Sequence, residues 1–252
     1  MELDTLALII LFFSGALAGF VDSIAGGGGI ITLPALLAVG IPPHQALATN
    51  KLQSSFGSFT STLNYARLGL MRPKELLVGV LFTLIGAALG AIVVQMFRAD
   101  SLVSLIIIML IVIFLYTLFT PNLGAIKKEH KMNHNLFYII FGLLIGFYDG
   151  FFGPGTGSFW TMALVLLLGL DLKEATAQTK LFNFTSNIVS LSVFIYSGLV
   201  IWIAGLVMGA GQIIGAFLGS SLVSKREVKF IRKFFLTIVA LTIIKLIYQY
   251  YF

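Results

Sequence analysis

The chain has 252 residues, of which 58% are hydrophobic and only 10% are charged. With a mean hydropathy of +1.02, this composition is that of an integral membrane protein. The absence of cysteine excludes disulfides and thiolate metal sites, and the three histidines fall in predicted loops, so we expect no metal and no cofactor. The net charge of +6 is accounted for by basic cytoplasmic loops, so membrane lipids, and not nucleic acid, are the expected partners.

Apolar runs near the ~20 residues that cross a bilayer recur along the chain. They predict long helices over residues 5–22, 43–66, 74–97, 101–120, 135–149, 172–196, 201–223 and 228–251. Two shorter apolar segments, 30–39 and 156–168, favour re-entrant or broken helices over full spans. The first apolar segment follows Glu2 and Asp4 instead of a basic start, so we expect it to stay as structure and not to act as a signal peptide.

The chain repeats itself. Residues 19–29, GFVDSIAGGGG, align with residues 146–156, GFYDGFFGPGT, at an offset of 127. Residues 40–54, GIPPHQALATNKLQS, align with residues 169–183, GLDLKEATAQTKLFN, at an offset of 129, which then also pairs Gly86 with Gly215 and Gly90 with Gly219. The sequence therefore predicts two membrane repeats, residues 1–123 and 132–252, each of about five helical segments, joined by a polar linker at 124–131.

The positions of lysine and arginine predict the orientation of these segments. Positive charges concentrate in segments 67–74, 127–131 and 225–233, which should be cytoplasmic. The counterpart of the first segment, residues 196–203, has no charge and should face outward. We therefore expect an all-α integral membrane protein of two inverted-topology repeats with both termini external, in which glycine-rich broken or re-entrant helices meet near the bilayer midplane.

Glycine-rich stretches precede both short helices. The first contains Gly26, Gly27, Gly28 and Gly29, and the second spans residues 153–157 and contains Gly153, Gly155 and Thr156. Glycine lets the backbone turn so that its amides converge on one point, and the start of the next helix adds a favourable dipole for an anion. These stretches predict one anion-binding nest in each repeat. Close helix packing, or a flexible turn, is the alternative.

Two lysines lie inside predicted membrane helices. At bilayer depth a lysine costs on the order of 2.5 to 3.5 kcal/mol on insertion scales, so Lys51 and Lys180 require compensation by partners, water or substrate. Each also begins a polar stripe at helical spacing, which predicts the wall of a polar cavity; the stripes are Lys51, Ser54, Ser55, Ser58 and Thr62, and Lys180, Asn183, Asn187 and Ser190. In the alternative, each lysine reaches an interface or pairs with Asp22 or Asp149 and has no role in substrate binding.

Asp22 and Asp149 occupy equivalent positions in the two repeats, and three interpretations of them stay open. They can hold the lysines in the charged form, carry a coupling proton because burial raises the pKa of a carboxyl, or cap the glycine turn. A further motif, GAGQIIG at 209–215, is not a dinucleotide site, because no strand precedes it. Its glycines continue a spacing of four from Gly205 to Gly219, which favours close helix packing, either within the chain or in a homodimer.

The two glycine regions, together with the Ala-Thr-Asn-Lys sequence at 48–51, resemble the signature regions of the sulfite exporter TauE/SafE family over essentially the whole chain. The resemblance implies a bacterial inner-membrane permease for a small anionic sulfur compound, such as sulfite, thiosulfate or an organosulfonate like sulfoacetate, driven by the proton or by the membrane potential. The family signature falls on Asp22, Gly26 to Gly29, Asn50 and Lys51, and on Asp149, Gly153, Pro154, Gly155, Gln178 and Lys180. Pro154 interrupts the second glycine run and Thr179 stands opposite Asn50, so the two half-sites should differ.

We expect the two lysines to neutralise the anion, the glycine amides with Thr156 to bind its oxygens, and four amide side chains to orient it, namely Asn50, Gln53, Gln178 and Asn183. One half of the chain would then rock against the other about this site in alternating access. Two other classes of function stay open. An anion channel would have the same lining, and a carrier could take an anion without sulfur. An intramembrane enzyme is disfavoured, because the only tempting pair, Asp22 and Ser23, has no histidine nearby.

Overall fold

The computed structural model describes residues 3–119 and 132–223. Over these residues the protein is helical and contains no strand, as predicted for an all-α fold. The elements are α1 (Thr5–Ala25), α2 (Gly29–Ala38), α3 (Pro43–Arg67), the 3-10 turn η1 (Pro73–Leu76), α4 (Leu77–Val94), α5 (Ala99–Phe119), α6 (His134–Phe151), α7 (Thr156–Leu168), α8 (Leu172–Tyr196) and α9 (Trp202–Val223). The predicted linker at 124–131 and the predicted last helix at 228–251 lie outside the described residues.

Local signals explain where the helices begin and end. The side chains of Asp4 and Asp171 accept hydrogen bonds from backbone amides in the first turns of α1 and α8, as N-caps do. The first helix continues to Ala25, three residues past its predicted end, and stops where Gly26 takes a φ of 73°. The predicted helix 74–97 begins as a 3-10 turn at Pro73, after extended Arg72, and ends at Val94.

The described surface is that of a membrane protein. Four segments, residues 5–24, 73–94, 134–151 and 202–222, are long and apolar enough to cross a bilayer, whereas α2 and α7 have only 10 and 13 residues. Large apolar side chains point outward along the long helices, among them Leu81, Leu89, Leu144, Ile214 and Leu218. Polar side chains are instead buried along α3 and α8. This arrangement, apolar outside and polar inside, suits a lipid environment.

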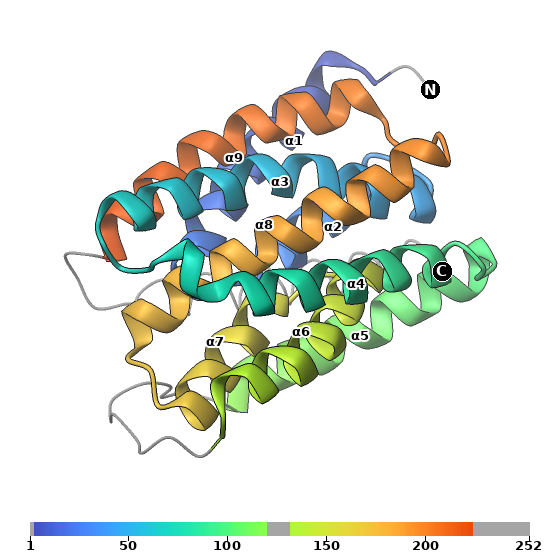
Figure 1. Cartoon of the computed structure of the whole chain (residues 1–252). Coiled ribbons are helices and arrows are strands. Elements are labelled where there is room, and N and C mark those ends of the chain that lie inside the picture. The colour runs from blue at the N-terminus through green and yellow to red at the C-terminus, as the bar shows by residue number, and fades with distance from the viewer. Residues whose placement is uncertain (1–2, 120–131, 224–252) are drawn as a thin grey trace.

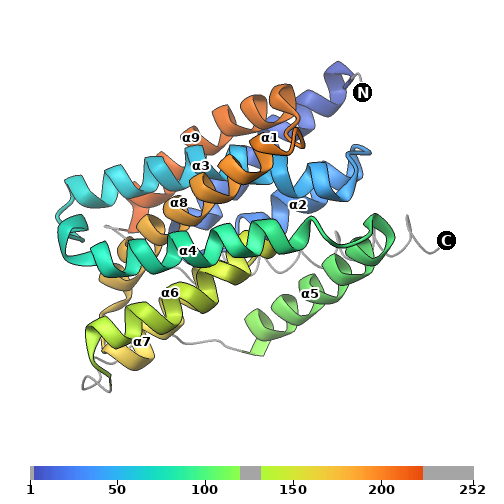
Figure 2. The same cartoon turned by 45° about the vertical axis from the view of Figure 1, so that its right-hand side comes forward.

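Helices from the two ends of the chain are interleaved. Figures 1 and 2 show α1, α3 and α9 on one side of the molecule and α4, α5 and α6 on the other, with α8 between them. The most extensive packing joins α1 to α9 and α4 to α6, and α8 packs on both α3 and α4. The first helix of each predicted repeat, α1 or α6, therefore packs against the fourth helix of the other repeat, α9 or α4.

Glycines bring these helix pairs close together, as the small-residue spacing predicts. A Cβ atom on Gly215 of α9 would lie 2.7 Å from the backbone nitrogen of Phe20 in α1, and one on Gly86 of α4 would lie 2.8 Å from that of Phe147 in α6. Gly86 and Gly215 are 129 positions apart, and Phe20 and Phe147 are 127 apart. The same contact thus occurs twice, and the glycines of α9 serve packing within the chain.

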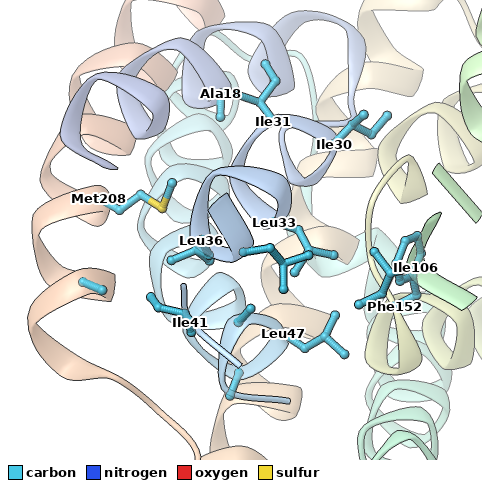
Figure 3. Close-up of a cluster of buried hydrophobic side chains, with 14 of the residues drawn as sticks. Ala18, Ile30, Ile31, Leu33, Leu36, Ile41, Leu47, Ile106, Phe152 and Met208 are labelled. Atoms are coloured by element: carbon cyan, nitrogen blue, oxygen red, sulfur yellow. The ribbon is translucent and has the colours of Figure 1, made fainter. Parts of the chain in front are cut away.

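Two apolar clusters hold the short helices in place. Figure 3 shows Leu33 and Leu36 of α2 surrounded by residues of neighbouring helices, including Leu47 of α3 and Met208 of α9. On the other side, the ring of Trp160 in α7 stacks on Phe182 of α8, with 4.4 Å between ring centroids. These contacts fix the start of each short helix, and the glycine stretches with it.

Candidate functional site

Two reciprocal ion pairs connect the two ends of the chain at the centre of the bundle. Lys51 Nζ of α3 lies 2.7 Å from Asp149 Oδ1 of α6, and Lys180 Nζ of α8 lies 2.9 Å from Asp22 Oδ2 of α1. Each ammonium also donates to the main-chain carbonyl of the same aspartate. Both lysines are almost fully buried, with 1% and 0% of their surface exposed. The pairing of lysine with aspartate, one of the alternatives open from the sequence, is what the structure contains.

The first glycine stretch binds a carboxylate of the protein itself. The backbone amides of Gly27 and Gly28 donate to Asp22 Oδ1 at 3.0 and 3.1 Å. Gly26 and Gly27 adopt φ values of 73° and 113°, a region that other residues rarely enter. Asp22 therefore both caps the glycine turn and pairs with Lys180. Its carboxylate occupies the place where the sequence predicts an anion.

The second glycine stretch has a different hydrogen-bonding pattern. Gly153 and Gly155 take φ values of 97° and 83°, and the hydroxyl of Thr156 donates to the carbonyl of Gly153 at 2.6 Å. The Thr156 hydroxyl is therefore engaged by the backbone. The two stretches touch, because a Cβ on Gly26 would lie 2.7 Å from Gly157 Cα and Ser158 Oγ donates to Gly26 O at 3.3 Å.

A small polar cavity of about 30 Å³ lies between these glycine stretches and the helices α3, α8 and α9. Ten of the residues predicted for the site contribute to its wall: Asp22, Gly27, Gly28, Gly29, Asn50, Lys51, Asp149, Gly153, Thr156 and Asn183. The remaining wall is formed by Ser54, Gly157, Asn187 and Gln212. The structure therefore brings most of the predicted site residues to one place.

Five predicted residues do not line the cavity. Gln178 Oε1 accepts from the hydroxyl of Tyr138 at 2.9 Å, and Gln53 Nε2 donates to Asn50 Oδ1 at 2.8 Å. Gln53 therefore lies behind Asn50 and Ser54, to both of which it donates. The others lie just behind the wall: Gly26 in the contact between the glycine stretches, Gly155 at the N-cap of α7, and Lys180, whose Nζ lies 3.5 Å from a Cβ placed on Gly157.

Equivalent positions make equivalent hydrogen bonds. Thr32 Oγ1 donates to Asn50 Oδ1 at 2.5 Å, and the hydroxyls of Thr161 and Thr179 lie 3.1 Å apart. Both members of the second pair are 129 positions beyond those of the first. The half-sites are therefore alike in architecture, although an amide in one is a hydroxyl in the other.

Sequence reasoning missed two residues of the site. Gln212 is 2% exposed and lines the cavity, and the hydroxyl of Ser186 donates to Asp149 Oδ2. Gln212 was not predicted because it lies in the motif at 209–215, whose glycines were interpreted as helix-packing positions. The available signal is that it is the one amide side chain of α9. Space for it is left by Gly19, where a Cβ would lie 2.8 Å from Gln212 Oε1, and by Gly57.

The four charged side chains of the site form two pairs of opposite charge. Asn183 Oδ1 is buried and has no hydrogen-bond partner among the described residues, an arrangement that costs about 1–3 kcal/mol. Within residues 3–119 and 132–223, no three His, Cys, Asp or Glu side chains gather as metal ligands. At about 30 Å³ the cavity is far smaller than the ~300 Å³ at which small-molecule sites begin, so an organic ligand requires the helices around it to separate.

A bundle with an apolar exterior, short helices broken by glycine and a buried, charge-compensated polar site is the architecture of a membrane transporter. Comparison with known proteins agrees. Residues 11–246 match the family described as Sulfite exporter TauE/SafE, and the chain belongs to this family.

Its relatives are named as membrane transporters. The chain is 45% identical over 244 residues to the probable membrane transporter protein YfcA of Escherichia coli K12, covering 97% of this chain and 91% of that protein. It is 46% identical over 225 residues to the probable membrane transporter protein ORF9 of a Sinorhizobium species, covering 89% and 86%. It is 39% identical over 249 residues to a probable membrane transporter protein of Haemophilus influenzae, covering 99% and 98%. No solved structure matches the chain.

Proposed function

We propose that the protein is a secondary transporter that moves small sulfur-containing oxyanions, such as sulfite or sulfoacetate-like organosulfonates, across the bacterial inner membrane. Transport is coupled to the proton or to the membrane potential. The sulfur chemistry of the substrate is supported by the description of the family. The negative charge of the substrate is supported by the lysine ammonium groups and backbone amides of the site.

The observation that carries the proposal is that this site already holds oxyanions. Lysine ammonium groups bind the carboxylates of Asp22 and Asp149 in the interior of the bundle, and the backbone amides of Gly27 and Gly28 also bind that of Asp22. Sulfite and sulfonate oxygens are acceptors of the same kind, so they can take the place of a carboxylate oxygen at the same donors. Asn50, Asn183 and Gln212 add amide groups that can orient the anion.

Alternating access follows from the proposed arrangement of the repeats. The duplicated contacts between α1 and α9 and between α4 and α6 support two repeats related by an inverting axis near the cavity. Rocking of the helices about this axis would expose the site to each side in turn. In this arrangement both termini and the turn between α8 and α9 are external, and the turn between α3 and α4 is cytoplasmic.

Thermal unfolding of the purified protein in the presence of a panel of anions tests the proposal. The panel contains sulfite, sulfate, thiosulfate, sulfoacetate, taurine, oxalate, phosphate and chloride. A ligand that binds only the folded state at ~100 times its dissociation constant adds ~2.7 kcal/mol to the free energy of unfolding. We expect a sulfur oxyanion to stabilise the parent protein, and not Lys51→Ala.

Exposed cations on the same helices provide matched controls. Arg67→Ala on α3 and Lys173→Ala on α8 remove a positive charge away from the cavity and should leave the stabilisation intact. A double variant, Lys51→Gln with Asp149→Asn, removes the charged pair without leaving a buried charge unpaired, and it should fold but lose the stabilisation. If no sulfur oxyanion stabilises the parent, or if the double variant responds as the parent does, the proposal is wrong.

A further inference from the structure

The two ion pairs are not equivalent, although the sequence places their members at equivalent positions. Both members of the Lys51–Asp149 pair line the cavity. In the other pair only Asp22 does, and Lys180 is fully buried behind Gly157. An anion in the cavity can therefore reach the ammonium of Lys51 directly, but not that of Lys180.

The two carboxylates also differ in the hydrogen-bond donors that each would keep if its lysine moved away. Asp22 would keep the amides of Gly27 and Gly28. A backbone amide can only donate, so these contacts favour the ionised carboxylate and offer nothing to a protonated one. Among the described residues, Asp149 would keep only the hydroxyl of Ser186.

A hydroxyl can accept as well as donate, and Ser186 has an alternative partner for its own hydrogen. Its Oγ lies 3.0 Å from the carbonyl oxygen of Asn183, to which it can donate. Ser186 can therefore turn its hydrogen to Asn183 and accept one from Asp149. The surroundings of Asp149 accommodate both the ionised and the protonated carboxyl.

Within residues 3–119 and 132–223, no other charged side chain is placed to replace Lys51 beside Asp149. Helices α4 and α7, which pack against α6, have no charged residue, and α8 contributes Ser186 there while its Lys180 is held by Asp22 of α1. The neighbouring titratable group Tyr148, on α6 itself, donates its hydroxyl to Pro154 O at 2.6 Å. If an anion took Lys51, an ionised Asp149 would be left buried without a cation, which is strongly unfavourable.

From this asymmetry we infer that Asp149 is the proton-binding site of the transporter and that Asp22 stays ionised as a structural anion. The inference rests on the proposed function of the site. An incoming oxyanion takes Lys51 from Asp149, one proton from solution binds to the carboxylate of Asp149, and Ser186 accepts the resulting hydrogen bond. The reverse exchange releases anion and proton together. The transporter thus moves one proton with each anion, and the pair Lys180–Asp22 keeps its charges throughout.

Titration calorimetry of the purified protein with thiosulfate and with sulfoacetate tests this inference, since neither anion titrates near neutral pH. Repeating each titration in two buffers with different heats of ionisation counts the protons taken up on binding. We expect about one proton per anion in the parent, with affinity falling about tenfold for each unit rise in pH, as linkage to one proton requires. Asp149→Asn should bind the anion with no proton uptake and no dependence on pH.

Asp22→Asn is the matched control, because it neutralises the equivalent carboxylate. Although it should be less stable, we expect it still to take up one proton with each anion. Proton uptake in Asp149→Asn, or its loss in Asp22→Asn, would overturn the assignment. Anion binding by the parent without any proton uptake would overturn this inference but leave the proposed function standing, whereas failure of the parent to bind any anion of the panel would overturn both.

Infrared difference spectroscopy of the parent provides a second measurement if Asp149→Asn does not fold. Binding of thiosulfate should produce a band of a newly protonated carboxyl group, and this band should persist in Asp22→Asn. The absence of such a band in a parent protein that binds the anion contradicts the inference.

Discussion

Ser58 of α3 and Asn187 of α8, which are 129 positions apart, lie side by side, with 3.5 Å between Ser58 Oγ and Asn187 Nδ2. This is the offset that relates the two predicted repeats. A residue can contact its own counterpart only beside the axis that relates them. If the two predicted repeats are related by such an axis, Ser58 and Asn187 lie beside it, next to the cavity that Asn187 lines.

Cysteines placed at these two positions should be joined by a short thiol crosslinker. The chain contains no cysteine, so Ser58→Cys with Asn187→Cys can be made without altering any other residue. A crosslink between α3 and α8 would keep the helices around the cavity from separating to admit an anion. We therefore expect the crosslinked protein to stop moving anions in liposomes and each single variant treated in the same way to remain active. Continued transport by the fully crosslinked protein would show that these helices do not move apart.

Matched positions at two helix ends test the inverted topology. Leu68 and Ser197 are the exposed C-cap residues of α3 and α8 and are also 129 positions apart. A membrane-impermeant thiol reagent should label Ser197→Cys in intact cells and Leu68→Cys only after permeabilisation. Labelling of both from the same side would mean that the repeats are parallel.

Gly215→Ala should destabilise the protein, because the added methyl group would meet the backbone of Ala16 and Phe20 in α1. Overpacking of this kind costs about 1–3 kcal/mol, and thermal unfolding in detergent would measure it. The control is Ile214→Ala, which removes an exposed side chain from the next position of α9 and should change little. Equal effects of the two substitutions would contradict close packing at Gly215.

Gly57→Ala should also lower the free energy of unfolding, in this case because its methyl group would collide with Gln212 Oε1. A flexible side chain can be shortened where a backbone cannot, so Gln212→Ala should recover most of the loss in the double variant. A double-mutant cycle by thermal unfolding would show this coupling. Additive effects would mean that Gly57 has another function than leaving room for Gln212.

Lys180→Gln should reduce stability more than it reduces anion affinity, because Lys180 does not line the cavity. Leaving Asp22 without its cation costs about 3–5 kcal/mol, as when one partner of a buried pair is removed. Adding Asp22→Asn should restore part of this loss. The measurement is thermal unfolding with and without the stabilising anion, and a Lys180→Gln variant that is stable but does not bind the anion would be inconsistent with the expectation.

Most of the fold could be predicted from the sequence, because apolar runs and caps act locally. The bounds of α7 and α8 are those predicted, since Asp171 caps α8 and glycines at 155 and 169 flank α7. The site was predictable as a set of residues, because a lysine in a membrane helix demands partners. Each lysine pairs with the aspartate of the other predicted repeat. This pairing depends on how helices from the two repeats pack together, and no local sequence pattern shows that packing.

Other features of the site could not be predicted from the sequence either, because they also depend on the packing of distant segments. Lys51 and Lys180 occupy equivalent places in the alignment, yet only the three-dimensional packing puts Gly157 between Lys180 and the cavity. Gln178 follows the family signature but bonds to Tyr138, 40 positions away. Gln212 reaches the cavity because Gly19 and Gly57, on two other helices, leave space for it. Each of these depends on neighbours that are distant in sequence.

A substrate anion that binds at Lys51 would compete with the carboxylate of Asp149, which is attached to the same chain. A carboxylate tethered within 2.7 Å of the ammonium has an effective local concentration far above that of a free solute. If the substrate binds at Lys51, its apparent affinity therefore depends on the free energy needed to break the Lys51–Asp149 ion pair as much as on the contacts of the anion itself. Such a carrier saturates only at high concentrations of its anion. It is therefore suited to moving an anion that has accumulated and poorly suited to taking up an anion present at low concentration.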